Sequence, residues 1–248
     1  MFEKYINEVI FEGGLLPASY LNALPVVRYL KQVERLAFSS AVTFFVGENG
    51  TGKSTLLEAI AVSYGFNAEG GSRNLNFFTK KTHSELCDHI RLSKKAHPKD
   101  GFFLRAESVY NMASNIDKRD EGGSFGPKII ESYGGVSLHE QSHGESFLAI
   151  VQNRFGGNGI YLLDEPEAAL SPMRQLTLLA ELDRLVKAGS QLIIATHSPI
   201  LTAFPGAEIL EFTENGISKT EYKDTEHYRI TKQFLNDPDR MLYYLLNE

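Results

Sequence analysis

Residues 42–63 read VTFFVGENGTGKSTLLEAIAVS, and this stretch decides the fold of the chain. The run from Val42 to Val46 is apolar, β-branched and aromatic, which is typical of a buried strand. A glycine-rich segment follows, and from Ser54 onward apolar residues recur at the spacing of a helix. The order of strand, glycine loop and helix predicts an α/β domain that begins with a phosphate-binding loop.

The eight residues GENGTGKS at 47–54 fit the pattern G-x-x-x-x-G-K-[ST] at every position. Glycines let successive backbone N–H groups turn toward a phosphate, and the following helix presents its positive dipole end to the anion. Lys53 adds a mobile positive charge, and Ser54 supplies a hard oxygen for Mg²⁺. A chance glycine turn before a core helix is the alternative, and both flanking elements argue against it. The predicted nucleotide contacts are Asn49, Gly50, Thr51, Gly52, Lys53, Ser54 and Thr55.

A second apolar strand, beginning at Ile160, ends in two acids, Asp164 and Glu165. The carboxyl end of such a strand faces the crevice where α/β sheets bind ligands. We expect Asp164 to hold Mg²⁺ and Glu165 to act as general base toward a water molecule. Adjacent strand residues point to opposite faces, so both acids serve one site only if the strand ends at Asp164. Pro166 favours that ending; a solvated strand end is the alternative.

Secondary structure is predicted along most of the chain. Strand 160–163, helix 174–188 and strand 191–195 form a parallel βαβ unit. Two further regions, 24–46 and 207–222, are predicted as antiparallel strands, the second with a hairpin turn at Asn215-Gly216. Helices are expected after the strand that ends in Asp164 and Glu165, and at the C-terminus. The predicted remainder comprises a mostly helical lobe over 66–145 with one strand at 102–105, a helix at 147–155, and two short helices at 225–247 with Pro238 near the start of the second.

Composition narrows the class of protein further. The chain has 248 residues, 42% of them hydrophobic, and a net charge of −6. Its one cysteine, Cys87, excludes an internal disulfide, and no apolar run reaches the length that crosses a bilayer. We therefore expect a cytoplasmic protein without membrane insertion.

The segment Ser142-His143-Gly144-Glu145-Ser146 lies 22 residues before Asp164 and precedes a predicted helix. It resembles the signature motif of ABC ATPases, in the S-x-G-E form of the SMC/RecF-like branch. The resemblance implies that Ser142, Gly144 and Glu145 contact the γ-phosphate of ATP held by a second copy of the chain. Without that nucleotide the segment is a helix-capping sequence, which is the alternative interpretation.

Two more segments resemble the same family. Residues 167–172, EAALSP, resemble the D-loop, in which Ser171 is implied to contact nucleotide. Residues 195–199, ATHSP, resemble the switch-histidine loop, which implies that His197 contacts the γ-phosphate and the attacking water. His197 alone would suggest a structural histidine, so this role depends on the whole set of motifs.

The resemblance covers nearly the whole chain and extends to the stand-alone bacterial predicted ATPases of the AAA/ABC P-loop superfamily. It implies an α/β P-loop fold of the ABC type, with a mixed sheet flanked by helices, an antiparallel β subdomain and a helical lobe. One domain is expected over 1–248, with the nucleotide-binding core in 1–65 and 156–248 and the signature lobe in 66–155. The implied ligands are ATP and Mg²⁺, and the implied state is an ATP-dependent head-to-tail homodimer.

The sequence departs from the family in three places. Glu107 stands where ABC ATPases usually carry a glutamine, and it is a candidate ligand of Mg²⁺ or of its water. His143 and Glu145 replace residues of the L-S-G-G-Q signature of transporter subunits. Tyr29 and Phe38 are the candidate aromatic residues for stacking on adenine, but neither lies in a recognisable motif, so base selectivity stays open.

Three functional interpretations compete: an ATPase that switches by dimerising, in DNA maintenance or defence; the nucleotide-binding subunit of a membrane transporter; and a nucleotide sensor that does not hydrolyse ATP. The 88 residues between Lys53 and Ser142 lack heptads, so no long coiled-coil arm is expected. Residues 80–105 carry seven Lys or Arg against three acids, a weak indication of DNA binding for which a solvated surface is the simpler explanation. An unidentified protein partner is a further expectation.

Overall fold

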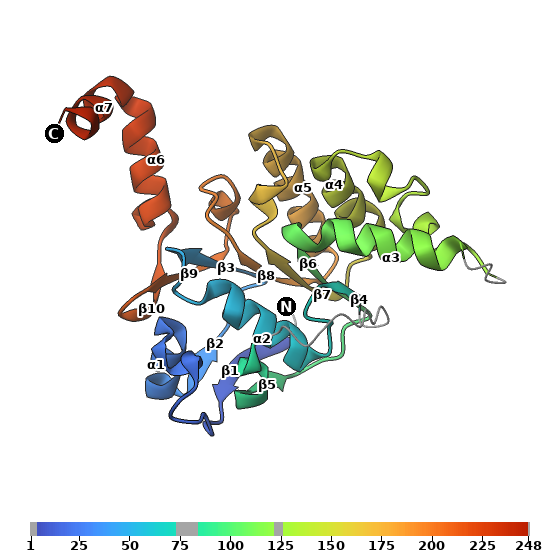
Figure 1. The fold of residues 1–248 in the computed structure, drawn as a ribbon, viewed down its shortest axis with the longest axis horizontal. Helices are drawn as coiled ribbons and strands as arrows, with labels where there is room; N and C mark the ends of the chain where they lie inside the picture. Colours follow the sequence, from blue (N-terminus) through green and yellow to red (C-terminus); the bar gives the residue numbers. More distant parts are fainter. Residues whose placement is uncertain (1–3, 73–83, 122–125, 248) are drawn as a thin grey trace.

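The computed structural model describes residues 4–72, 84–121 and 126–247. A seven-stranded sheet of order β10-β9-β3-β8-β7-β6-β4 runs through the middle of the molecule (Figure 1). Its strands are β3 (Val42–Gly47), β4 (Gly71–Ser72), β6 (Asp100–Arg105), β7 (Gly159–Asp164), β8 (Gln191–Ala195), β9 (Glu208–Thr213) and β10 (Gly216–Thr220). Strands β9, β3, β8, β7 and β6 are mutually parallel, whereas β10 and β4 pair antiparallel at the edges. This mixed sheet confirms the predicted fold class.

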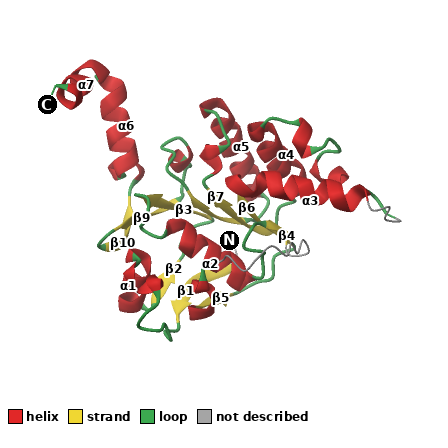
Figure 2. Cartoon of the chain, in the orientation of Figure 1, coloured by secondary structure: helices red, strands yellow, loops and turns green. Residues whose placement is uncertain are grey.

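Helices cover both faces of this sheet (Figure 2). On one face lie α1 (Pro25–Val33), α2 (Lys53–Tyr64) and a smaller antiparallel sheet of order β2-β1-β5. On the other face lie α3 (Val109–Glu121), α4 (His143–Arg154) and α5 (Pro172–Lys187). The strands of the smaller sheet are β1 (Ile6–Phe11), β2 (Arg35–Ala37) and β5 (Ile90–Lys94).

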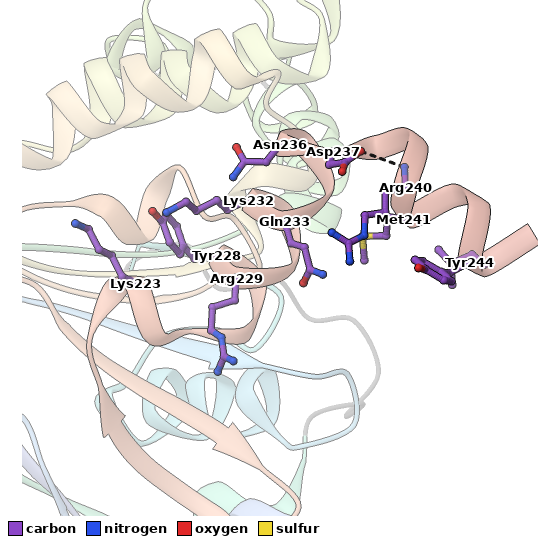
Figure 3. A pocket seen from close by; sticks show the side chains of 11 residues that line it. Lys223, Tyr228, Arg229, Lys232, Gln233, Asn236, Asp237, Arg240, Met241 and Tyr244 are labelled. Carbon is purple, nitrogen blue, oxygen red and sulfur yellow. Dashed lines mark hydrogen bonds between the residues drawn. The ribbon is translucent and has the colours of Figure 1, made fainter.

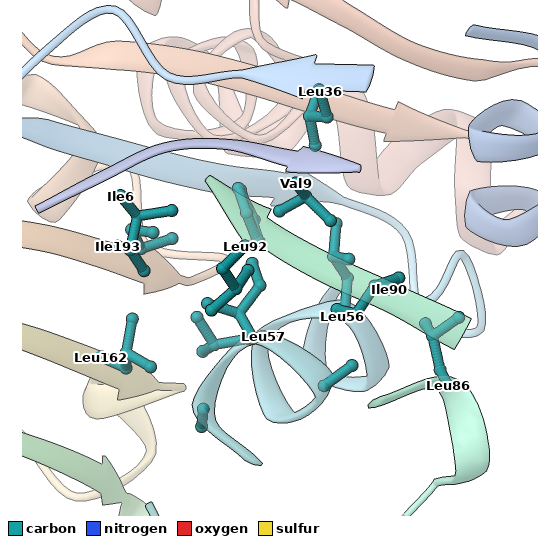
Figure 4. Close-up of a cluster of buried hydrophobic side chains, with 14 of the residues drawn as sticks. Ile6, Val9, Leu36, Leu56, Leu57, Leu86, Ile90, Leu92, Leu162 and Ile193 are labelled. Atoms are coloured by element: carbon teal, nitrogen blue, oxygen red, sulfur yellow. The ribbon is translucent and has the colours of Figure 1, made fainter. Parts of the chain in front are cut away.

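The central strands are apolar on both sides because each face is covered. Leu162 and Ile193 point toward α2 and the small sheet, where they join Leu57 in one buried cluster (Figure 4). Their sequence neighbours, Leu163 and Ile194, point into the second cluster with α3, α4 and α5. The strands whose ends carry the predicted site are therefore packed between two buried cores.

The antiparallel subdomain is present, and the two regions predicted as antiparallel strands are confirmed in part. The hairpin in 207–222 extends the large sheet, and the subdomain is β2-β1-β5. Within 24–46, residues Pro25–Val33 form helix α1 rather than a strand. Pro25 at the first helical position is preset for a helix, and Val26 and Leu30 are buried on one face of it. The two valines suggested a strand, but helical packing overrode their propensity.

The hairpin turn is one residue earlier than predicted. Gly216 pairs with Thr213, so Glu214 and Asn215 form the two-residue loop. Gly216 starts β10 with φ of +131°, and a Cβ there would lie 2.5 Å from the ring of Tyr29. Packing against α1 therefore keeps the glycine inside the strand.

The stretch 66–145 was expected to be mostly helical, and this was wrong for its first half. It contains β4, β5 and β6, of which β5 pairs with β1 and β6 with β7. Strand β5 buries only Ile90 and Leu92, too short an alternation to stand out in the sequence. The parallel βαβ unit β7–α5–β8, the strand at 102–105 and the helix α4 are confirmed. The division into core and signature lobe stays a prediction.

The two predicted C-terminal helices are confirmed as α6 (Glu226–Asn236) and α7 (Pro238–Leu246), with Pro238 at the first position of α7. They project from the body of the molecule (Figure 1), and neither has a buried residue. In the described part of the chain, every helix is too short or too polar to span a bilayer.

Gly47→Ala should destabilise the fold. A Cβ on Gly47 would lie 2.0 Å from the backbone oxygen of Phe212 on β9, at a φ of +127°. We expect a loss of about 2–4 kcal/mol in the free energy of unfolding, from overlap and backbone strain together. Urea unfolding of this variant beside Gly126→Ala, whose Cβ would meet no atom within 4 Å, checks the prediction. Equal stability of the two variants would contradict it.

Candidate nucleotide-binding site

The phosphate loop leaves β3 at Gly47 and enters α2 at Lys53. The Lys53 ammonium is buried and donates to the carbonyl oxygens of Gly47 and Glu48, at 2.7 and 2.8 Å. Burial lowers the pKa of Lys53, against the raising effect of nearby acids led by Glu165. The lysine therefore stabilises the loop by binding two of its carbonyl oxygens.

The loop also packs tightly against α1. Gly52 precedes α2 with φ of +98°, and a Cβ there would lie 2.3 Å from Cγ1 of Val26. The Thr51 hydroxyl donates to the Glu48 carbonyl at 2.8 Å. The other predicted contacts lie where expected: Asn49 and Gly50 are exposed at the tip of the loop, and Thr55 follows Ser54 in the first turn of α2.

The magnesium candidates meet at the carboxyl edge of the sheet. Asp164 is the last residue of β7, and its Oδ1 accepts a hydrogen bond of 2.9 Å from the Ser54 hydroxyl. Glu107 lies just beyond β6, in the short helix η3 (Ala106–Ser108), and its side chain is 71% exposed. The structure thus brings Ser54 and Asp164 into contact, while Glu107 lies at the edge of the same cavity and pairs with Arg105 at 2.7 Å.

Arg105, the last residue of β6, is a site residue that the sequence analysis counted as surface charge. Its guanidinium contacts Glu58 at 2.8 Å, Glu107 at 2.7 Å and Asp164 at 3.4 Å. The strand register sets Arg105 beside Asp164. Because Glu58, Arg105 and Asp164 are far apart in sequence, only the tertiary structure reveals the cluster.

The Ser54 and Asp164 pair fits a magnesium ion. Burial raises the pKa of Asp164 to about 6, so a cation nearby would favour its charged form. Carboxylate and hydroxyl oxygens are ligands that Mg²⁺ prefers. Among the described residues there is no group of three or more His, Cys, Asp or Glu arranged to hold a metal. Mg²⁺ usually takes one or two protein ligands together with phosphate and water, and Ser54 and Asp164 could supply two.

Glu165 turns into the same site because the backbone reverses there. It has a left-handed conformation, with φ of 48° and ψ of 51°, directly after the strand ends at Asp164. Its carboxylate oxygen lies 3.8 Å from Nε2 of His197, which follows β8. The predicted strand ending is confirmed, and the two candidate catalytic residues face each other.

The D-loop and the switch-histidine loop are joined by Glu167. Its half-buried carboxylate accepts hydrogen bonds from the Thr196 hydroxyl, at 2.7 Å, and from the backbone N–H of His197. Burial raises the pKa of Glu167. Ser171, further along the D-loop, is exposed at the N-terminus of α5, and no contact in the described chain joins it to the phosphate loop. The sequence analysis gave Glu167 no role of its own.

The signature segment caps α4 at an exposed position. The Glu145 carboxylate accepts hydrogen bonds from the backbone N–H and the hydroxyl of Ser142, at 2.9 and 2.6 Å. Arg174 of α5 binds both residues, at 3.0 Å to the Ser142 hydroxyl and 2.9 Å to Glu145. Gly144 lies under this arginine, since a Cβ there would be 2.5 Å from its Nη1. Arg174, which the sequence did not single out, fixes the signature in place.

A cavity of about 490 Å³ lies between the acids at the sheet edge and the signature segment at the start of α4. It is lined by Ser54, Arg105, Glu107, Asp164 and Glu165 together with His143 of the signature segment. The acids and the N-terminal end of α4 therefore lie around the same cavity, on one face of the molecule.

Of the two candidates for adenine stacking, Phe38 is buried and Tyr29 is partly exposed. Phe38 is 1% exposed in the core, and the Tyr29 ring packs against Gly216.

The indication of DNA binding from the basic stretch 80–105 is weaker in the structure than in the sequence. Arg91 pairs with Glu12 at 2.7 Å and Arg105 turns into the site, while Lys80 and Lys81 lie outside the described residues.

Comparison with known proteins agrees with this geometry. Residues 27–128 match a family model described as "AAA domain", and residues 131–203 match one described as "AAA domain, putative AbiEii toxin, Type IV TA system". The chain is 27% identical over 188 residues to the ribose import ATP-binding protein RbsA of Yersinia pestis, covering 68% of this chain and 35% of that protein. It is 25% identical over 205 residues to the hemin import ATP-binding protein HmuV of Rhodopseudomonas palustris, covering 77% and 76%.

A solved structure supports the fold. MJ1267, an ATP-binding cassette of an ABC transporter, matches with a TM-score of 0.51 and 16% identity, over 97% of this chain and 99% of that one. The fold is similar to that of this ATP-binding cassette. The matches make the chain similar to AAA-domain proteins and to ATP-binding proteins of the ABC type, which agrees with the predicted resemblance to ABC ATPases. The likeness to the SMC/RecF-like branch stays a prediction. It spans about a third of the length of the ribose import proteins that it matches.

The raised pKa of Asp164 makes stability depend on pH. A carboxyl that titrates at about 6 when folded and near ~3.9 when unfolded costs stability as pH rises between these values. In metal-free protein, the stability of Asp164→Asn relative to wild type should therefore increase by about 2–3 kcal/mol from pH 4 to pH 8, mostly below pH 6. Urea unfolding in EDTA measures this, and a difference that does not vary with pH would contradict it.

Proposed function

We propose that the protein binds MgATP and hydrolyses it to ADP and phosphate between two copies docked head to tail. The observation that carries the proposal is the convergence of Lys53, Ser54, Asp164, Glu165 and His197 at one edge of the sheet. The exposed signature cap lies on the same face, which supports head-to-tail docking. A second copy could present its own cap to a nucleotide held at this edge.

In this mechanism the residues of one copy hold the triphosphate. Backbone N–H groups of residues 49–55 bind the phosphates, and Lys53 exchanges its carbonyl contacts for phosphate oxygens. Ser54 and Asp164, with Glu107 at the edge of the cavity, would hold Mg²⁺, which neutralises charge on the phosphate oxygens when bound. Ser142, Gly144, Glu145 and Ser171 of the second copy would close over the γ-phosphate.

Glu165 then accepts a proton from the water that attacks in line. His197 lies within 3.8 Å of this carboxylate and donates a hydrogen bond to the γ-phosphate or the water. Two such sites form in a two-fold dimer, and closing and opening them is the conformational switch. DNA maintenance or defence is the process that we propose for the switch.

The second candidate is the nucleotide-binding subunit of a membrane transporter, which the names of the relatives favour. Co-purification of a membrane protein with the chain would support it. A sensor without turnover is the third, and the Glu165–His197 pair argues against it.

Glu165→Gln should abolish turnover without loss of binding. Loss of the general base lowers kcat at least ~100-fold, while ATP affinity changes little because the phosphate contacts remain. Phosphate release and molar mass with ATP should show an inactive, trapped dimer. Glu85→Gln, at an exposed acid outside the site, is the matched control and should behave as wild type. Turnover of Glu165→Gln at the wild-type rate would overturn the assignment.

A mixing experiment tests the shared site. Lys53→Ala removes the phosphate lysine, and Ser142→Arg blocks the exposed signature cap, so each variant alone should be inactive. In a head-to-tail dimer of one copy of each, one of the two sites is intact, and random pairing restores about a quarter of wild-type turnover. A mixture as inactive as its components would show that the two motifs do not act between copies.

A further inference from the structure

A second histidine, His227 in the first turn of α6, lies against His197. The Nδ1 of His197 is 2.7 Å from Nε2 of His227, and the two rings stack at 17° with centroids 4.9 Å apart. The pair connects the switch-histidine loop to an element that none of the sequence motifs includes.

A contact of this length needs one proton between the two nitrogens. His197 is neutral near pH 7, since burial first, then the charges of Lys53 and His227, lower its pKa to about 4. A neutral imidazole carries a single proton, so a proton on Nδ1 leaves Nε2 as an acceptor, and a proton on Nε2 leaves Nδ1 as an acceptor.

The surroundings of Nε2 decide between these two forms. It is enclosed, finds no hydrogen-bond partner among the described residues, and lies 3.8 Å from the carboxylate of Glu165. A lone pair on Nε2 would face that negative charge, whereas an N–H there would be attracted to it. The favourable form has the proton on Nε2, and Nδ1 then accepts from the Nε2–H of His227.

We propose that His227 is a positioning residue that holds His197 in the tautomer with its proton on Nε2. This deepens the proposed function, because His197 can then donate from Nε2 to the γ-phosphate or the attacking water. The partner of one ring nitrogen fixes the role of the other.

Hydrogen bonds fix the first turn of α6, which carries His227. Thr225 is 2% exposed, donates to the Tyr222 carbonyl at 2.9 Å and accepts from the N–H of Tyr228. The backbone N–H of Glu226 donates to Glu211 of β9 at 3.2 Å. Beyond this turn, α6 and α7 project from the body of the molecule. A cavity of about 810 Å³ lies between the two helices (Figure 3). The C-terminal helices thus meet the catalytic loop through His227.

Two substitutions at His227 that are isosteric with each other test the proposal. In His227→Gln the side-chain amide can still donate to Nδ1 of His197, so kcat at pH 8 should stay within about threefold of wild type. In His227→Glu the carboxylate only accepts, which draws the proton of His197 to Nδ1, and kcat should fall about 10–100-fold with KM for ATP unchanged. A purely structural role would affect the two variants alike, so equal kcat values would overturn the proposal.

A second measurement does not depend on turnover. The ¹⁵N shifts of the His197 imidazole should report protonated Nε2 in the wild type and in His227→Gln, and protonated Nδ1 in His227→Glu. Protonated Nδ1 in the wild type would overturn the proposal. If the wild type showed these shifts but hydrolysed no ATP, the proposed function would fail while the assignment of the tautomer would stand.

Discussion

The site depends on the common edge at which the parallel strands end. Asp164 pairs with both Arg105 of β6 and Ala195 of β8, and β8 in turn pairs with β3, which leads into the phosphate loop. Parallel neighbours end together, so loops distant in sequence start side by side. Two buried cores hold the strands in this register, and a slip of one residue would move every side chain to the other face.

Three cations stabilise the arrangement from within. Lys53 satisfies carbonyl groups of the phosphate loop, Arg105 balances the acids at the sheet edge, and Arg174 binds the signature cap. Lys53 is buried, and a buried charge is tolerated only where it is paired or hydrogen-bonded; Arg105 and Arg174 are partly exposed and pair with acids. Each also lies where phosphate or Mg²⁺ would compete for its partner, so ligand binding exchanges one set of contacts for another.

The loops at this edge are also linked to one another. Glu167 connects the D-loop to the loop of His197, and His197 touches the first turn of α6. These contacts place the D-loop, the loop of His197 and the first turn of α6 in one connected series.

The sequence by itself determined the phosphate loop, the acid-bearing strand, the βαβ unit and the two C-terminal helices, because local spacing, glycine and proline specify them. It missed strand β5 and helix α1, since β5 is short and Pro25–Val33 carries residues typical of strands. Only the tertiary structure decided that Arg105 belongs to the site and that His227 touches His197. These pairings join residues 30 to 59 positions apart through strand register and helix docking, which no local pattern encodes.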